Sequence, residues 1–208
     1  MPTGTLATRE ADGRNLRRLH SRDRAVDAVL DLIAEGVPSP TAQQIADRSG
    51  ISIRTVFRLT EDVESLHAAA VQHQVDRIAP LFVPLPTEGS TDERIRALVA
   101  NRAVIYEAIA PVRRIAERLA PGSPGIARGL EYNHRFLRSQ VAEVFDTELS
   151  QMKRPLARDA LDAADVASSW ETWDQLRRVR KLSVEESARV VRLLLFGALP
   201  ATTLSDHP

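Results

Sequence analysis

The chain of 208 residues is 43% hydrophobic, which is enough to bury a sizeable core in one or two domains. The absence of cysteine excludes disulfides and thiolate metal sites and favours a cytoplasmic location. The formal net charge is zero, so affinity for an anionic polymer would have to come from local basic segments. The longest apolar run is too short to span a bilayer and no signal segment opens the sequence, so we expect no membrane contact.

Basic residues gather ahead of the first apolar segment. They are Arg14, Arg17, Arg18, Arg22 and Arg24, with His20 among them. We expect residues 1–20 to form a flexible basic arm, of which residues 1–13 are a solvated tail. For Arg17 to Arg22 two alternatives stay open: contact with the phosphate groups of a partner, and a face that meets only solvent.

The next segment, residues 21–60, contains three short helical patterns in succession. The first places Val26, Val29, Leu30 and Ile33 on one face and stops at Gly36 and Pro38. In the second, Thr41 is a suitable N-cap with Gln44 as its capping-box partner. Ile45 and Ala46 then face inward, and Ala46 is small enough for a further helix to cross close to it.

The third helical pattern follows a tight turn. Gly50 stands where the chain needs a left-handed residue, which glycine adopts at little cost, and Ile51 can fill the core beneath it. Ser52 is a good N-cap for a helix that turns Val56 and Leu59 inward. Three such helices are typical of a helix-turn-helix, an element that reads DNA. An ordinary helical hairpin is the alternative, because caps, glycine and apolar spacing occur there too.

A long fourth helix follows directly. Asp62 can cap it, and its inner stripe contains Leu66, Ala69, Ala70 and His73. Pro80, Pro84, Pro86 and Gly89 then interrupt helical structure and indicate a hinge near residues 80–90. We therefore assign the head with its linking helix to residues 21–80 and a second domain to residues 81–208.

The second domain contains only helical patterns. They predict a helix from residue 91, a shorter one at about 111–119 beginning at Pro111, a loop at 121–125, and helices at 126–149, 155–179 and 184–199. No convincing strand pattern or internal repeat is present. The sequence therefore predicts an all-α protein.

The last two helices have strong apolar stripes. One stripe contains Ala163, Val166, Ala167, Trp170, Trp173 and Leu176 or Arg177, and the other Ala188, Val191, Leu194, Leu195 and Ala198. A hairpin this apolar needs a partner surface, and two copies would form a four-helix bundle. We expect a homodimer built on residues 155–199, with packing of both helices inside the chain's own core as the alternative.

The head with its linking helix resembles that of the TetR family of bacterial transcription regulators. The resemblance rests on Thr41, Ile45 and Ala46, on Gly50, Ile51 and Ser52 in the turn, on Thr55, Val56 and Phe57, and on Glu64 with Leu66. It is specific over residues 21–70 and architectural beyond them. It implies a dimeric repressor that binds a palindromic operator in double-stranded DNA. It also implies a small-molecule effector, bound in the second domain, that moves the fourth helix and releases the DNA.

The chain departs from the family pattern at two positions. Phe57 stands where a tyrosine usually offers its hydroxyl to a phosphate, and Val63 replaces a usual basic residue. Both changes remove phosphate contacts and lower the expected affinity. Arg58 and the basic arm can compensate, unless Arg58 pairs with Glu61 or Asp62 within the chain.

A recognition helix in the major groove would present the side chains that do not face the core. The candidate DNA-binding residues are Arg22, Thr41, Gln43, Ser52, Ile53, Arg54, Thr55, Phe57 and Arg58. Arg54 can donate two hydrogen bonds to a guanine, Gln43 can pair with an adenine, and Ile53 can pack on a thymine methyl group. The threonine hydroxyls suit phosphate oxygens, which fix register rather than sequence.

The second domain offers a few aromatic or switchable side chains for an effector pocket. They are Tyr106, Tyr132, His134, Phe136, Trp170 and Trp173. Aromatic rings with a polar atom suit a mostly apolar pocket with a few orienting hydrogen bonds. Core packing or dimer contact is the alternative for each. Arg102, Arg113 and Glu131 could bind an effector charge or could simply be solvated.

No catalytic or metal-binding pattern accompanies these features. The histidines are His20, His67, His73, His134 and His207, and none lies in an HExxH pattern. GxSxG and phosphate-binding glycine loops are absent as well. We therefore expect neither an enzyme nor a metal or cofactor. The alternative to a DNA-binding regulator is a helical dimeric interaction protein with a degenerate head that no longer binds DNA.

Overall fold

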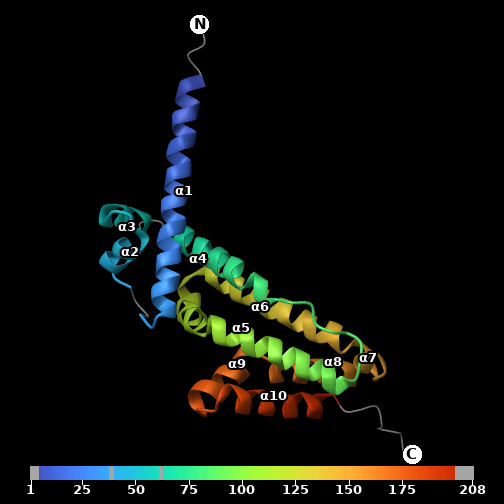
Figure 1. The fold of residues 1–208 in the computed structure, drawn as a ribbon. Coiled ribbons are helices and arrows are strands. Elements are labelled where there is room, and N and C mark those ends of the chain that lie inside the picture. Colours follow the sequence, from blue (N-terminus) through green and yellow to red (C-terminus); the bar gives the residue numbers. More distant parts are fainter. Residues whose placement is uncertain (1–4, 38–39, 61–62, 200–208) are drawn as a thin grey trace, which may run out of the picture. The chain divides into compact units, whose positions relative to one another are not determined.

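The computed structural model describes residues 5–37, 40–60 and 63–199, and all regular structure in this part is helical (Figure 1). The prediction of an all-α protein is confirmed. Among these same residues, no helix combines the length and the apolar character needed to cross a membrane.

The chain forms two compact units. The first comprises residues 1–77 together with 111–130, and the second comprises residues 78–110 together with 131–208. Residues 111–130 thus belong to the first unit, whereas the sequence placed everything after residue 80 in one second domain. Two long helices, α5 and α6, contribute residues to both units.

The first unit contains the expected helix-turn-helix. Its helices are α1 (Thr5–Ala34), α2 (Ala42–Ser49), α3 (Ile53–Thr60) and α4 (Val63–Ile78). Helices α2 and α3 pack on α1 through a buried cluster of Ala25, Ala28, Leu32, Ile45, Ala46, Val56 and Leu59. Ile51 packs against this cluster from the turn, as the sequence predicted.

Helix α1 has a second buried face. Val26 and Leu30 pack with Ala69 of α4, and Val112 lies against the same cluster. The sequence led us to place Val26, Val29, Leu30 and Ile33 on a single face. The structure instead shows two neighbouring faces, because α1 has to contact α2 and α3 on one and α4 on the other.

The start of α1 differs from the prediction. We expected a flexible arm over residues 1–20; the helix already begins at Thr5, and residues 1–4 lie outside the described part. The segment contains no proline after residue 4, and its alanine, leucine and arginine residues have high helix propensity. Residues 5–20 are therefore helical and continuous with the rest of α1.

The linker after α4 has the expected interruption. A short 3-10 turn at Ala79–Leu81 follows α4, and irregular structure continues to Ser90. Helix α5 (Thr91–Leu119) then runs through Pro111 without ending, so the predicted separate helix at 111–119 is wrong. Proline removes a single helical hydrogen bond, but apolar packing continues on both sides of it through Ile109 and Val112.

The remaining helices of the chain are more segmented than expected. They are α6 (Pro124–Val144), α7 (Asp146–Ser150), α8 (Arg154–Ala167), α9 (Trp170–Asp174), a π-helical turn (Gln175–Val179) and α10 (Val184–Ala198). The predicted helix at 126–149 is broken at the fully buried Phe145. The one predicted at 155–179 is broken at two serines: Ser168 bonds back to the Ala164 carbonyl, and Ser169 caps α9.

The core of the second unit is one apolar cluster. Its largest side chains are Tyr106, Phe145, Trp170 and Trp173, surrounded by aliphatic residues of α5, α6, α8 and α10. Helices α8 and α10 lie side by side in this unit (Figure 1). The helix predicted at 184–199 is confirmed as α10, with Ser183 as its cap.

Candidate functional site

Local hydrogen bonds fix both ends of helix α2. The Gln44 amide donates to Thr41 Oγ1 at 3.2 Å, and the Thr41 amide donates to Gln44 Oε1 at 2.9 Å. At the other end, Gly50 adopts φ 65° and donates its amide to the Ala46 carbonyl. The capping box and the left-handed turn predicted from the sequence are both confirmed.

Helix α3 begins with a pair of hydroxyl groups. The Thr55 amide donates to Ser52 Oγ at 3.2 Å, which confirms Ser52 as the cap. The Ser52 and Thr55 hydroxyls also lie 2.8 Å apart. A phosphate oxygen could therefore meet two hydroxyls and the free amides at this helix start together.

The outer face of α3 is exposed, as the sequence predicted. Val56 and Leu59 are buried, whereas Ile53, Arg54, Phe57 and Arg58 are exposed, with Phe57 58% exposed. Glu61 and Asp62 lie outside the described residues, so the alternative partner of Arg58 stays open.

Some candidate DNA-binding residues, among them Gln43 on α2 and Arg22 on α1, lie outside α3. The exposed side chain of Gln43 donates from Nε2 to Asp47 Oδ1 at 2.7 Å, so contact with a base would have to replace this bond. Arg22, on α1, is only half-buried and keeps some access to solvent. The side chain of Val63 lies outside the described set.

Long-range contacts attach α2 to α1. Arg24 donates to the Ser49 carbonyl at the C-terminal end of α2. Arg48 binds Glu35 with two hydrogen bonds, at 2.9 and 2.7 Å, and this bonding lowers the pKa of Glu35. From the sequence, Arg24 was grouped with the basic arm, and no role was predicted for Arg48. A capping role of this kind becomes visible only when the crossing of the two helices is known.

Helix α4 is attached to α1 by ionisable groups. His73 lies 3.0 Å from Asp27 and 3.4 Å from Asp23, and Arg77 binds Asp31 at 2.8 Å. Burial lowers the pKa of His73, but the two aspartates outweigh it and leave the pKa above its ordinary value. The prediction that His73 lies on the inner stripe of this helix is correct, but residue spacing did not reveal the two aspartates that it contacts.

The structure divides the candidate effector residues into a buried group and an exposed group. Tyr106, Trp170 and Trp173 form the aromatic centre of the core, with ring centroids of Tyr106 and Trp170 5.8 Å apart. The Tyr106 hydroxyl donates to the Ser168 carbonyl at 2.8 Å. Trp173 Nε1 donates to Glu107 at 2.9 Å. The three buried side chains therefore pack in the core, and the polar atoms of Tyr106 and Trp173 form hydrogen bonds within the chain.

The exposed group lies on α6. Tyr132 is 60% exposed, Phe136 packs edge-to-face on Phe82 at 5.4 Å, and His134 lies 3.5 Å from Asp165. An open depression elsewhere on this unit is lined by Thr87, Ala142, Glu143, Asp146 and Thr147, with no predicted effector residue among them.

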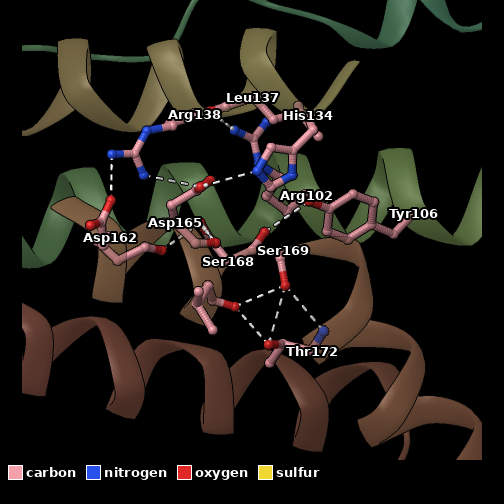
Figure 2. Close-up of polar contacts among 12 residues, drawn as sticks. Arg102, Tyr106, His134, Leu137, Arg138, Asp162, Asp165, Ser168, Ser169 and Thr172 are labelled. Carbon is pink, nitrogen blue, oxygen red and sulfur yellow. Dashed lines mark hydrogen bonds and ion pairs between the residues drawn. The ribbon is translucent and has the colours of Figure 1, made fainter. Parts of the chain in front are cut away.

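A buried arginine stands at the centre of a polar cluster between α5, α6 and α8 (Figure 2). Arg102 donates to Gln140 Oε1 at 2.8 Å and to the Leu137 carbonyl at 3.0 Å. Nearby, Arg138 binds both Asp162 and Asp165. The sequence analysis treated Arg102 as either an effector contact or a solvated residue, and the second alternative is wrong because the side chain is fully buried.

Much of the predicted dimer surface lies in the core instead. Ala167, Trp170, Trp173, Val191 and Leu195 all belong to the buried cluster of the second unit. The apolar stripes lie on the predicted helices. We expected these residues to face a second copy of the chain, but they face the chain's own core. The exposed large apolar side chains of the same helices are Leu156 and Val166 on α8 and Val184, Leu193, Leu194 and Phe196 on α10.

A comparison with solved structures shows a similar fold. The structure is similar to the crystal structure of a transcriptional regulator from Rhodococcus sp. Rha1, with a TM-score of 0.63 and 17% sequence identity. The similarity covers 86% of this chain and 95% of that chain. No protein-family model matches the sequence. The search of curated proteins found no similar sequence. The shared feature is thus the arrangement of helices.

Proposed function

We propose that the protein is a sequence-specific DNA-binding transcription regulator that acts as a dimer in the cytoplasm, most simply as a repressor released by a small-molecule effector. The observation that supports it best is the exposed outer face of α3 on a capped helix-turn-helix. The likeness of fold to a transcriptional regulator supports the same proposal.

Arg54 is the residue that would supply most of the sequence preference. It is exposed on the first turn of α3, and the fork of a guanidinium can bind O6 and N7 of guanine together. Ile53 beside it is apolar and exposed, so it can contact a thymine methyl group. Ser52 and Thr55 would hold a phosphate and set the register of the helix in the groove.

The proposed dimer uses the outward apolar side chains of α8 and α10. Leu193 is 72% exposed, and Leu194, Phe196 and Val166 accompany it. A monomer gains nothing from exposing so many large apolar side chains on two neighbouring helices, whereas a second copy would bury them. Leu193→Arg should therefore yield monomers in sedimentation, while Val83→Arg, at another exposed apolar site, should leave the dimer intact.

Effector release requires a ligand that distinguishes two arrangements of the heads. A ligand shifts such an equilibrium only by its difference in affinity for the two states, and the coupling is reciprocal. Operator DNA should therefore weaken effector binding by the same factor by which the effector weakens DNA binding. The intrinsic fluorescence of Trp170 and Trp173 gives a readout in the second unit for this comparison.

The proposal is tested by selection from random duplex DNA with the full chain. It predicts enrichment of a palindrome whose half-sites lie about one helical turn, or a multiple of it, apart. Selection without any enriched sequence would contradict it. That result would favour the interaction-protein alternative, which the exposed, hydroxyl-free Phe57 supports.

A further inference from the structure

Two arginines of α5 are buried, and they differ in what balances their charge. Arg94 is 3% exposed and binds the carboxylate of Glu148. Arg102 is 1% exposed and lies about two turns further along the helix. Its two hydrogen bonds go to uncharged oxygens of Gln140 and Leu137. Among the residues that the structure describes, the Nε atom has no hydrogen-bond partner in either arginine, so the two differ in the carboxylate alone. Within the described residues, Arg102 forms no ion pair.

The nearest carboxylate is already engaged. Asp165 lies close enough to raise the pKa of Arg102, as does Tyr106, but burial outweighs both and lowers that pKa. Asp165 accepts a hydrogen bond from Arg138 at 3.2 Å and faces His134 at 3.5 Å (Figure 2). An arginine stays protonated in proteins, so Arg102 keeps a buried positive charge that its own chain balances poorly.

The surroundings of Arg102 define what could balance it. Leu98 and Tyr106, one turn away on either side of α5, are both buried in the apolar core. A compound at this position would meet the buried Leu98 and Tyr106 on α5, the two oxygen acceptors on α6, and a guanidinium at one end. A cation would be repelled there. A phosphate dianion would bring two negative charges against one positive charge, whereas a carboxylate matches it.

We propose that Arg102 binds the carboxylate of a small amphipathic acid whose apolar body lies in the core of the second unit. The inference rests on the proposed function only in identifying this acid as the effector. Both acceptors of Arg102 are on α6, so the acid must displace α6 from α5 at this point. Binding would thus change the packing of the two long helices, which is the kind of change that an effector has to make.

Benzoate and benzamide test the charge requirement, because they have the same size and differ in charge. Benzoate should raise the melting temperature of the full-length protein and change its tryptophan fluorescence, and benzamide should do neither. In Arg102→Met, the concentration of benzoate needed for the same shift should rise about tenfold or more, since a charge-assisted pair is lost. Without ligand, this variant should melt at the same temperature as the wild type or higher. Arg135→Met, at an exposed arginine of α6, should respond like the wild type.

Three results would overturn the inference. They are an equal benzoate response in wild type and Arg102→Met, an equal response to benzoate and benzamide, and no response to either benzoate or hexanoate. If Arg102→Met does not fold, Arg102→Lys replaces it, and an unchanged benzoate response there counts against the inference in the same way. These measurements contain no DNA, so failure of the regulator proposal would leave their outcome unaffected.

Discussion

The helix-turn-helix and the second unit are held together over different distances along the chain. In the head, contacts within four residues define the short helices, as between Thr41 and Gln44 or Gly50 and Ala46. In the second unit, buried polar bonds join residues far apart in sequence, such as Arg94 with Glu148 and Tyr106 with Ser168. The short helices of the head are thus specified mostly by local signals, whereas their attachment to α1 and the buried polar bonds of the second unit depend on pairings that only the folded chain brings together.

The largest expected effect comes from breaking a long-range buried pair. Glu148→Ala should lower the free energy of unfolding by roughly 3–5 kcal/mol, because it leaves the charge of Arg94 buried and unpaired. Arg96→Ala removes an exposed pair with Asp92 on the same helix and should cost less than about 1 kcal/mol. Urea unfolding followed by tryptophan fluorescence measures both. Equal losses of free energy in the two variants would show that the buried pair stabilises the protein no more than the exposed pair does.

The pair of Arg94 and Glu148 should also make the free energy of unfolding depend on pH, in a direction that the pKa of Glu148 sets. Burial raises the pKa of Glu148, but hydrogen bonds from Arg94 and Thr91 outweigh it and leave the pKa lowered. The stabilisation should therefore be present above about pH 4.3, the ordinary pKa of glutamate, and disappear as the pH falls through the lower folded-state pKa. Unfolding curves of wild type and Glu148→Gln should converge in that acid range. If the difference in free energy of unfolding between wild type and Glu148→Gln grew towards low pH, a lowered pKa of Glu148 would be contradicted.

A smaller effect is expected from the turn of the head. Gly50 has φ 65°, and an added Cβ would stand 2.7 Å from Nη2 of Arg24. Gly50→Ala should cost about 1–2 kcal/mol through the left-handed backbone alone and should also disturb the bond from Arg24 to Ser49. Gly122→Ala, which has open space and no positive φ, is the control. Circular dichroism during urea unfolding measures both variants, and equal losses would argue against strain at the turn.

Helix capping is a local interaction that can be compared directly between the two units. Thr41 starts α2 in the head with a capping box, and Ser183 starts α10 in the second unit with another. Thr41→Ala and Ser183→Ala should each cost about 1 kcal/mol, because each variant loses the hydroxyl that accepts the amide of the third helical residue. Clearly unequal costs in urea unfolding would mean that local signals do not act alike in the two units.

The smallest expected effect is a pH-dependent contact of α4. The pKa of His73 is raised by Asp27 and Asp23, so its stabilisation is complete below about pH 6.5 and is lost as the pH rises through the folded-state pKa. His73→Gln should reduce the stability gained at low pH by no more than about 1 kcal/mol, since both aspartates are partly exposed. A variant whose stability follows pH just as the wild type does would exclude this contact.

This difference in range explains which features could be predicted from the sequence. The caps at Thr41 and Ser52, the left-handed Gly50 and the inward Val56 and Leu59 follow from neighbouring residues, and the structure confirms them. The stripes of α8 and α10 were recognisable too, but an apolar residue does not reveal which surface it meets. Trp173 and Leu195 therefore proved to be core residues rather than interface residues.

The buried polar groups were the least predictable part. Arg102 has the spacing of a core residue and the chemistry of a surface one, and only the acceptors on α6 show why it can be inside. Arg24 and His73 likewise acquire partners through helix crossings that residue spacing does not specify. The break at Ser168 and Ser169 had a local signal, since serine favours helix ends, and that signal was missed.

Binding of the selected operator by wild type and Arg54→Ala tests the central claim most directly. Fluorescence anisotropy at fixed salt should show wild type binding the operator more tightly than a scrambled duplex. Arg54→Ala should weaken operator binding by about 1–3 kcal/mol, or roughly 5- to 150-fold, and leave the scrambled duplex almost unchanged. The exposed Arg135→Ala should bind both duplexes like the wild type. Equal affinity of the wild type for both duplexes, or an equal loss on both in Arg54→Ala, would contradict the claim that α3 reads the sequence.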